Sequence, residues 1–111
     1  MRRRKPTSDD FVEFVLDQLR DVDGVAARRM FDGHGLYAGE TFFGIVCRGQ
    51  LYFKTDDQTR TKYIAAGMEP FRPNRKQTIK TYFQVPADVL DDREKVAQWA
   101  AEAIRCESQG K

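Results

Sequence analysis

Cysteine and histidine are scarce in this sequence, and long apolar runs are missing. The 111 residues contain two cysteines and one histidine. Cys47 and Cys106 stand far apart and form no CxxC pair, so the sequence indicates neither a zinc ribbon nor a disulfide framework. We expect both thiols to be reduced, in a cytoplasmic protein.

No apolar stretch approaches the roughly 20 residues that a transmembrane helix needs. The N-terminus is basic, with Arg2, Arg3, Arg4 and Lys5, but no apolar segment follows it, which argues against a secretory signal peptide. The sequence therefore predicts a cytoplasmic location and no membrane partner.

Charge and length set further limits. Lysine and arginine exceed the acidic residues by only two, 19 against 17, which is far from the balance of a dedicated nucleic-acid module. A chain of 111 residues, 41% of them hydrophobic, is expected to form one domain with its own core. We expect this domain to span residues 8–106, between a disordered basic arm (1–7) and a tail (107–111).

The stretch from Arg28 to Lys54 organises the predicted fold. Its apolar runs have strand length and are separated by turn signals at Asp32-Gly33, around Gly39 and at Arg48-Gly49. This pattern predicts a meander of three or four antiparallel strands. In the strongest strand, 41–47, alternation assigns two sets of residues to opposite faces: Phe43, Ile45 and Cys47, and Phe42, Gly44 and Val46.

Helices and one more strand flank the meander. Apolar stripes at helical spacing predict a first helix over about 9–20 and a last helix after Asp91 and Asp92. Thr55 is expected to cap a second helix, with Gln58 at the capping-box position. Residues 72–77 are predicted as an exposed loop, and 78–85 as a strand whose one face holds Ile79, Thr81, Phe83 and Val85.

The predicted fold class is α+β, with helices packed on an antiparallel sheet of four to five strands in the order αβββ(β)αβα. In strand 50–54, Leu51 and Phe53 should face the core, and Tyr52 and Lys54 should face away from it. Arg48-Gly49 suits the two-residue turn that joins this strand to the preceding one.

Candidate catalytic and metal-binding residues are few. His34 lies between two glycines, where it is either a general base, a metal ligand or a turn residue with an unusual backbone angle. No metal-ligand spacing accompanies it, so we favour the turn residue. Cys47 is expected to be a buried, inert thiol and Cys106 to be exposed. We predict no catalytic residue, no metal and no cofactor, and an enzyme is the least favoured class.

Basic residues offer the remaining candidate site. One cluster is Arg28 and Arg29, the N-terminal arm is another, and the largest comprises Arg72, Arg75, Lys76 and Lys80. If these clusters converge on one face, they form a phosphate-contacting patch. Two alternatives stay open: an ordinary solvated surface, or an ion pair of Arg28 or Arg29 with an acid on a packed helix.

Four runs in the sequence resemble the TfoX N-terminal domain family (TfoX/Sxy), in the same order. The first run is RRMFDGHGLY, residues 28–37, and the others are LYFKTD (51–56), AAGMEPF (65–71) and YFQVP (82–86). The resemblance covers residues 8 to 106, which identifies the chain as a member of that family in the form of a standalone N-terminal domain.

The resemblance implies a secretion-chaperone-like α+β domain and no catalytic motif. Full-length TfoX/Sxy proteins regulate natural competence and are thought to act with the cyclic-AMP receptor protein at promoters of DNA-uptake genes. Full-length members carry a second, C-terminal domain, which is not expected here.

Two functional hypotheses follow from the residues and the resemblance. The first is a small cytoplasmic regulatory module that binds a protein partner in transcription regulation, such as a transcription factor or polymerase. The second is direct, weak nucleic-acid binding through the basic clusters. An exposed sheet edge could also pair two copies of the chain into a homodimer.

Overall fold

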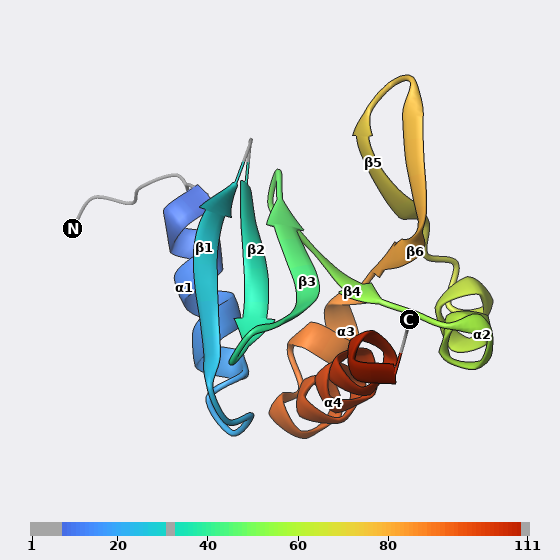
Figure 1. Cartoon of the computed structure of the whole chain (residues 1–111). Helices are drawn as coiled ribbons and strands as arrows, with labels where there is room; N and C mark the ends of the chain where they lie inside the picture. The colour runs from blue at the N-terminus through green and yellow to red at the C-terminus, as the bar shows by residue number, and fades with distance from the viewer. Residues whose placement is uncertain (1–7, 31–32, 110–111) are drawn as a thin grey trace.

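A computed structural model describes residues 8–30 and 33–109, which form an α+β domain (Figure 1). Within these residues lie four helices and six strands. In chain order they are α1 (Ser8–Gln18), β1 (Val25–Met30), β2 (Gly33–Ala38), β3 (Thr41–Cys47), β4 (Gln50–Lys54), α2 (Asp57–Ala65), β5 (Pro70–Asn74), β6 (Gln77–Gln84), α3 (Ala87–Leu90) and α4 (Arg93–Gln109).

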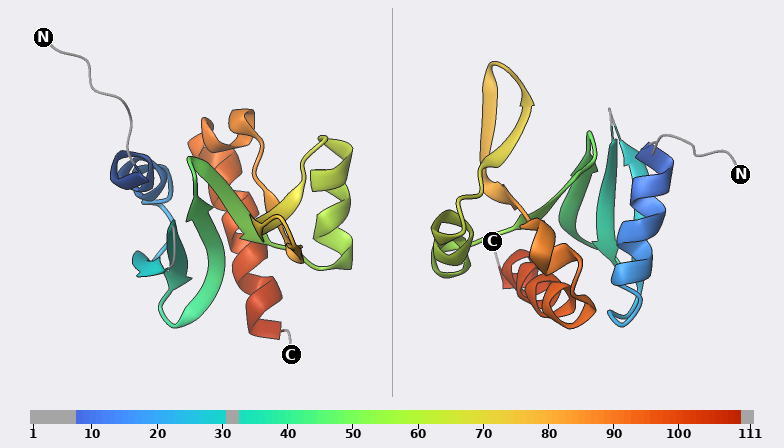
Figure 2. Two further views of the ribbon diagram at one scale, coloured as in Figure 1. Left: turned by 90° about the horizontal axis from the view of Figure 1, so that it is seen from above. Right: turned by 180° about the vertical axis from the view of Figure 1, so that it is seen from behind.

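The six strands form one antiparallel sheet in the order β1-β2-β3-β4-β6-β5. β1 and β5 are the edge strands, and the β5–β6 hairpin stands away from the rest of the domain (Figures 1 and 2). The predicted fold class is therefore confirmed, with one strand more than the upper end of the expected number. The Asp32-Gly33 turn falls partly, and the N-terminal arm entirely, outside the described residues.

The helices cover one face of the sheet and bury the main core against it. α1 packs on β1, α4 on β3 and β4, and α2 on β6. The predicted apolar stripes supply the helix side of this core, through Val15 of α1, Leu19 just after it, and Val96 and Ala100 of α4, all fully buried. The sheet side consists of Leu36, Phe43, Val46, Leu51, Phe53 and Phe83.

A second, smaller apolar cluster lies on the opposite face of the sheet. It consists of strand residues alone: Ile45, Cys47, Phe71 and Tyr82 are buried in it, and Phe42, Tyr52 and Ile79 pack against it. We call this side the open face, because no helix contributes to its cluster among the described residues. The opposite orientations expected for Tyr52 and Phe53 are confirmed.

The strict alternation predicted for β3 is wrong, because a β-bulge interrupts the strand. Leu36 of β2 pairs with Gly44, whereas the next residue, Tyr37, pairs with Phe42. Phe43 is thus an extra residue, and the alternation changes phase at that point. As a result Phe43 lies in the main core with Val46, while Phe42 joins Ile45 on the open face.

The loop predicted at residues 72–77 is mostly a strand. Pro70–Asn74 forms edge strand β5, and only Arg75 and Lys76 remain in the turn to β6. The register between the two strands is irregular, since Phe71 pairs with Ile79 and Pro70 with Phe83. Ile79 consequently lies on the open face with Tyr82, not on the Phe83 side as alternation predicts.

The caps of the helices differ in part from the expectation. Asp56, not Thr55, caps α2: its carboxylate accepts from the backbone N–H groups of Gln58 and Thr59 at 3.0 and 2.8 Å. Thr55 is instead buried, and its hydroxyl donates to the carbonyl of Thr81. At α4 the expectation is confirmed, because the Asp92 carboxylate accepts from the backbone N–H groups of Glu94 and Lys95 in the first turn.

The β3–β4 hairpin has the predicted turn. Arg48 and Gly49 both have positive φ, 52° and 75°. This combination matches the twist of a two-residue hairpin, and for arginine it is strained.

The end of α1 is held to the segment between α3 and α4. The Gln18 side chain at the end of α1 donates to the Leu90 carbonyl at the end of α3, at 2.7 Å. Close by, the Arg93 guanidinium pairs with Asp21 at 2.9 Å. α1 is therefore fixed by the segment that follows the last strand. Within the described residues no helix has the length and apolar character needed to cross a membrane.

Candidate interaction surfaces

The six cations predicted as a site fall into two groups at opposite edges of the sheet. Arg28 and Arg29 lie on β1. Arg72, Arg75, Lys76 and Lys80 gather on the β5–β6 hairpin, where all four are exposed. Five strand spacings separate β1 from β5, which is about 24 Å along the sheet. The structure thus unites the second cluster but does not join it to the first.

Aromatic rings occupy the open face between these two groups. Tyr37 of β2 contacts Phe42 of β3 with ring centroids 5.2 Å apart, and Phe42 contacts Tyr82 of β6 at 5.6 Å. Beside them, Tyr52 of β4 packs against Phe71 of β5 at 4.8 Å. Tyr37, Phe42 and Tyr52 are only half-buried, so part of each ring faces solvent.

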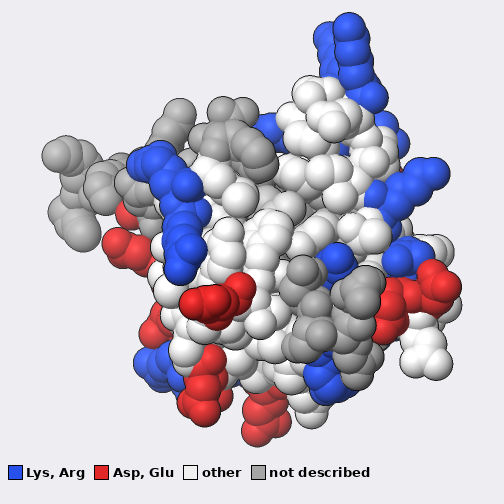
Figure 3. Space-filling view, viewed as in Figure 1, with Lys and Arg blue, Asp and Glu red and all other residues white. Residues whose placement is uncertain are grey.

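Cations lie directly over this row of rings. The Arg28 guanidinium is 4.4 Å from the centre of the Tyr37 ring, and the Lys54 ammonium is 5.6 Å from that of Tyr82. Such placement is attractive because the face of an aromatic ring is electron-rich. Figure 3 shows Lys and Arg on both sides of this face, over the β1 edge and over the hairpin, with uncharged residues between them.

Arg48 ties the β3–β4 turn to the hairpin. Its guanidinium donates to the Arg72 carbonyl at 2.7 Å. Two hollows lie beside this contact: one of about 330 Å³ is lined by Phe71 and Ile79, and one of about 430 Å³ by Tyr52 and Glu69. Burial raises the pKa of Tyr52, and the neighbouring Arg48 partly opposes this, so its hydroxyl stays neutral at physiological pH.

Sequence reasoning did not include Arg48 and Lys54 among the site residues. The signal for Lys54 was present, because alternation in β4 already placed it on the face away from the core. No comparable signal existed for Arg48, since its contact with Arg72 depends on how the hairpin folds back.

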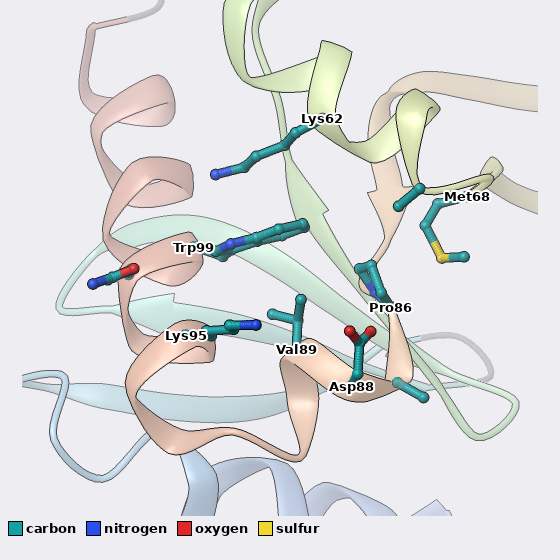
Figure 4. Close-up of a pocket in the computed structure, with 10 residues that line it drawn as sticks. Lys62, Met68, Pro86, Asp88, Val89, Lys95 and Trp99 are labelled. Atoms are coloured by element: carbon teal, nitrogen blue, oxygen red, sulfur yellow. The ribbon is translucent and has the colours of Figure 1, made fainter.

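A second surface lies on the helical side, between α2, α3 and α4. A wide depression of about 760 Å³ there is lined mainly by the apolar side chains of Trp99, Val89, Pro86 and Met68. Figure 4 shows Lys62 reaching from α2 over the indole of Trp99, with Lys95, Val89 and Asp88 on the other side of the ring. The Lys62 ammonium is 4.3 Å from the ring centre and also pairs with Glu102.

His34 and the cysteines give no comparable site. His34 is not a turn residue as predicted: it lies within β2, opposite Arg29 and Val46. Its Nδ1 is buried and has no hydrogen-bond partner. Cys47 is buried as expected, whereas Cys106, predicted to be exposed, is 7% exposed beneath Thr59, and burial raises the pKa of its thiol. No group of three metal-ligating side chains occurs in the described part of the chain.

Comparison with known protein families gives a match over most of the chain. The family model of the TfoX N-terminal domain matches residues 17–107, which is most of the chain and includes every strand and both surfaces described above. No curated protein matches the sequence.

Proposed function

The chain belongs to the TfoX N-terminal domain family, and from that premise we propose that it is a small cytoplasmic regulatory module that binds a protein partner in transcription regulation. The family suggests a competence-related regulatory role. In this proposal the domain acts by binding, without catalysis, and its partner is a transcription factor or a polymerase.

The observation that carries the proposal is the depression around Trp99. Its floor is apolar and open to solvent, and apolar surface of this kind at the junction of three helices suits the anchoring side chains of a partner. Tryptophan is enriched among the residues that dominate binding energy at protein interfaces. Lys95 and Asp88 at the rim add charges of both signs, which would fix the orientation of the partner.

Affinity capture with two matched charge reversals tests this proposal. Lys95→Glu changes the rim of the depression, and Lys80→Glu makes the same change on the hairpin, where the residue is also exposed. We expect the wild type and Lys80→Glu to retain one stoichiometric protein from native lysate. Lys95→Glu should weaken its binding by about tenfold, or about 1.4 kcal/mol. Calorimetric titration with the purified partner then measures the two affinities.

Three results would count against the proposal. One is the recovery of no stoichiometric partner by the wild type, and another is a partner without a role in transcription. The third is equal retention by Lys95→Glu, which would place the partner elsewhere on the domain. Circular dichroism of both variants is needed to show that each charge reversal leaves the fold intact.

A further inference from the structure

We propose that the open face of the sheet binds single-stranded nucleic acid, with bases stacked on its aromatic rings and phosphates held by the cations on either side. This inference goes beyond the proposed partner: it uses the opposite side of the sheet from the Trp99 depression and stands or falls independently of it.

The rings provide the stacking surface. Tyr37, Phe42 and Tyr52 come from three adjacent strands and keep part of each ring in solvent. Phe42 packs against Tyr82 and Tyr52 packs against Phe71, and these two neighbours are themselves buried, at 6% and 1% exposed. A sheet that presents fixed aromatic rings is a surface on which unpaired bases stack, because every base has a π face.

The cations supply the complementary charge for the phosphates. Arg28 lies over Tyr37 at one side, and Arg48 and Arg72 lie together at the other. Farther along the hairpin, Lys80 of β6 and the turn residues Arg75 and Lys76 are exposed and add positive charge. A single nucleic-acid strand laid across the open face from β1 towards β5 would meet a cation, then the aromatic rings, then further cations. Proteins that bind single strands combine positive charge along the backbone with rings for the bases in this way.

The same features favour a single strand over other occupants. In a duplex the bases are already paired and stacked, so the half-exposed rings would have no base to stack with, and only phosphate contacts would remain. A second copy of this chain would bring two sets of arginines face to face, and like charges across an interface are unfavourable. Among the described residues that line the hollows beside Arg48, Glu69 is the only carboxylate, so little negative charge there opposes a phosphate.

Fluorescence anisotropy with a labelled oligonucleotide of about 12 nucleotides tests the proposal. The same sequence is offered as a single strand and as a duplex, at low and at physiological salt. We expect the single strand to bind at least about tenfold more tightly than the duplex, and the affinity to fall as salt rises. No binding at low salt, or equal binding of single strand and duplex, would overturn the proposal.

Variants separate stacking from charge. Phe42→Leu keeps an apolar side chain but removes the ring, and it should weaken single-strand binding by about 5- to 100-fold with little change in salt dependence. Lys80→Glu should weaken binding and also reduce its salt dependence. Lys95→Glu, a matched reversal on the helical side, should leave binding unchanged. Loss with Lys80→Glu but none with Phe42→Leu would mean that the hairpin alone holds phosphates, and the stacking face would be rejected.

A measurement on the wild type covers the case in which Phe42→Leu fails to fold. Photo-crosslinking to an oligonucleotide that carries 5-bromouracil, followed by mass spectrometry, should place the crosslinks on Tyr37, Phe42 or Tyr52. Crosslinks confined to other residues would overturn the proposal. So would sedimentation showing that the wild type dimerises through this face, with the oligonucleotide unable to compete.

Discussion

The two faces of the sheet both carry aromatic rings, and consecutive residues of the same strand serve opposite sides. Phe43 and Phe53 are completely buried under the helices. Their chain neighbours Phe42 and Tyr52 are half-buried on the open face, where cations lie over the nearby rings of Tyr37 and Tyr82. In β3 and β4, residues on one face therefore stabilise the core, and their neighbours on the other face are free for binding. A shift of one residue along a strand moves a side chain from one face to the other.

The largest expected effect tests this division directly. Phe53→Ala should lower the free energy of unfolding by about 3–5 kcal/mol, because a fully buried ring leaves a cavity. Tyr52→Ala should cost only about 1–2 kcal/mol, since part of its ring is already in water. Chemical denaturation followed by circular dichroism measures both values. Equal losses would show that the open-face cluster is a second core, not a binding surface.

Substitution of Trp99 tests whether the whole helical side of the sheet is buried core or whether part of it is an accessible surface. The indole packs edge-on against Tyr63 at 4.8 Å, yet it is only half-buried at the edge of the depression. Trp99→Ala should therefore cost about 2 kcal/mol, below the loss at a fully buried ring. The matched variant Trp99→Phe should recover most of that stability. A loss as large as that of Phe53→Ala would mean that the depression is filled core and not an accessible surface.

Arg48, at the junction between β3 and the hairpin, sharpens the comparison further. Arg48→Ala keeps the strained positive φ and loses the hydrogen bond to the Arg72 carbonyl, so it should cost about 1–1.5 kcal/mol. Arg48→Gly loses the same hydrogen bond but accepts the backbone angle, so it should be about 1 kcal/mol more stable than Arg48→Ala. Thermal unfolding of the pair gives the difference, and identical stabilities would remove the argument for strain.

The smallest expected effect lies at the start of α2, which is peripheral to both faces. Asp56→Ala removes the cap and should cost about 0.5–1 kcal/mol at neutral pH. The backbone N–H of Thr59 lowers the pKa of Asp56 in the folded state. Its stabilising effect is therefore complete above the unfolded pKa, near 3.9, and disappears as the pH falls through the lower folded value. Unfolding curves of wild type and variant should converge in acid; a constant gap would contradict the assignment.

Local patterns in the sequence predicted the parts of the fold that depend on local rules. Apolar stripes identified α1 and α4, and the Arg48-Gly49 turn identified the β3–β4 hairpin. β5 was not predicted because its sequence, PFRPN, lacks a strand-like alternation and contains two prolines, which edge strands tolerate. The bulge at Phe43 was not predicted because it depends on how β3 pairs with β2, and the local sequence does not determine that pairing.

The candidate site was predictable only in part, for a similar reason. The six cations were visible in the sequence, but their distances depend on the strand order, in which β6 pairs with β4 and β5 lies beyond it. The row of rings between them depends on the same long-range pairing. The ring neighbours Phe42 and Tyr82, for example, are brought together only when β6 completes the sheet.

The link between α1 and the segment after β6 has a consequence for how the protein is made. The ribosome releases α1 first. The Leu90 carbonyl that accepts from Gln18 and the Arg93 that pairs with Asp21 emerge about 70 residues later, after all six strands. Until then the apolar stripe of the helix lacks much of its cover, and a nascent chain with such a surface is open to aggregation or to chaperones. The domain can therefore close over α1 only after α3 and the start of α4 have been synthesised.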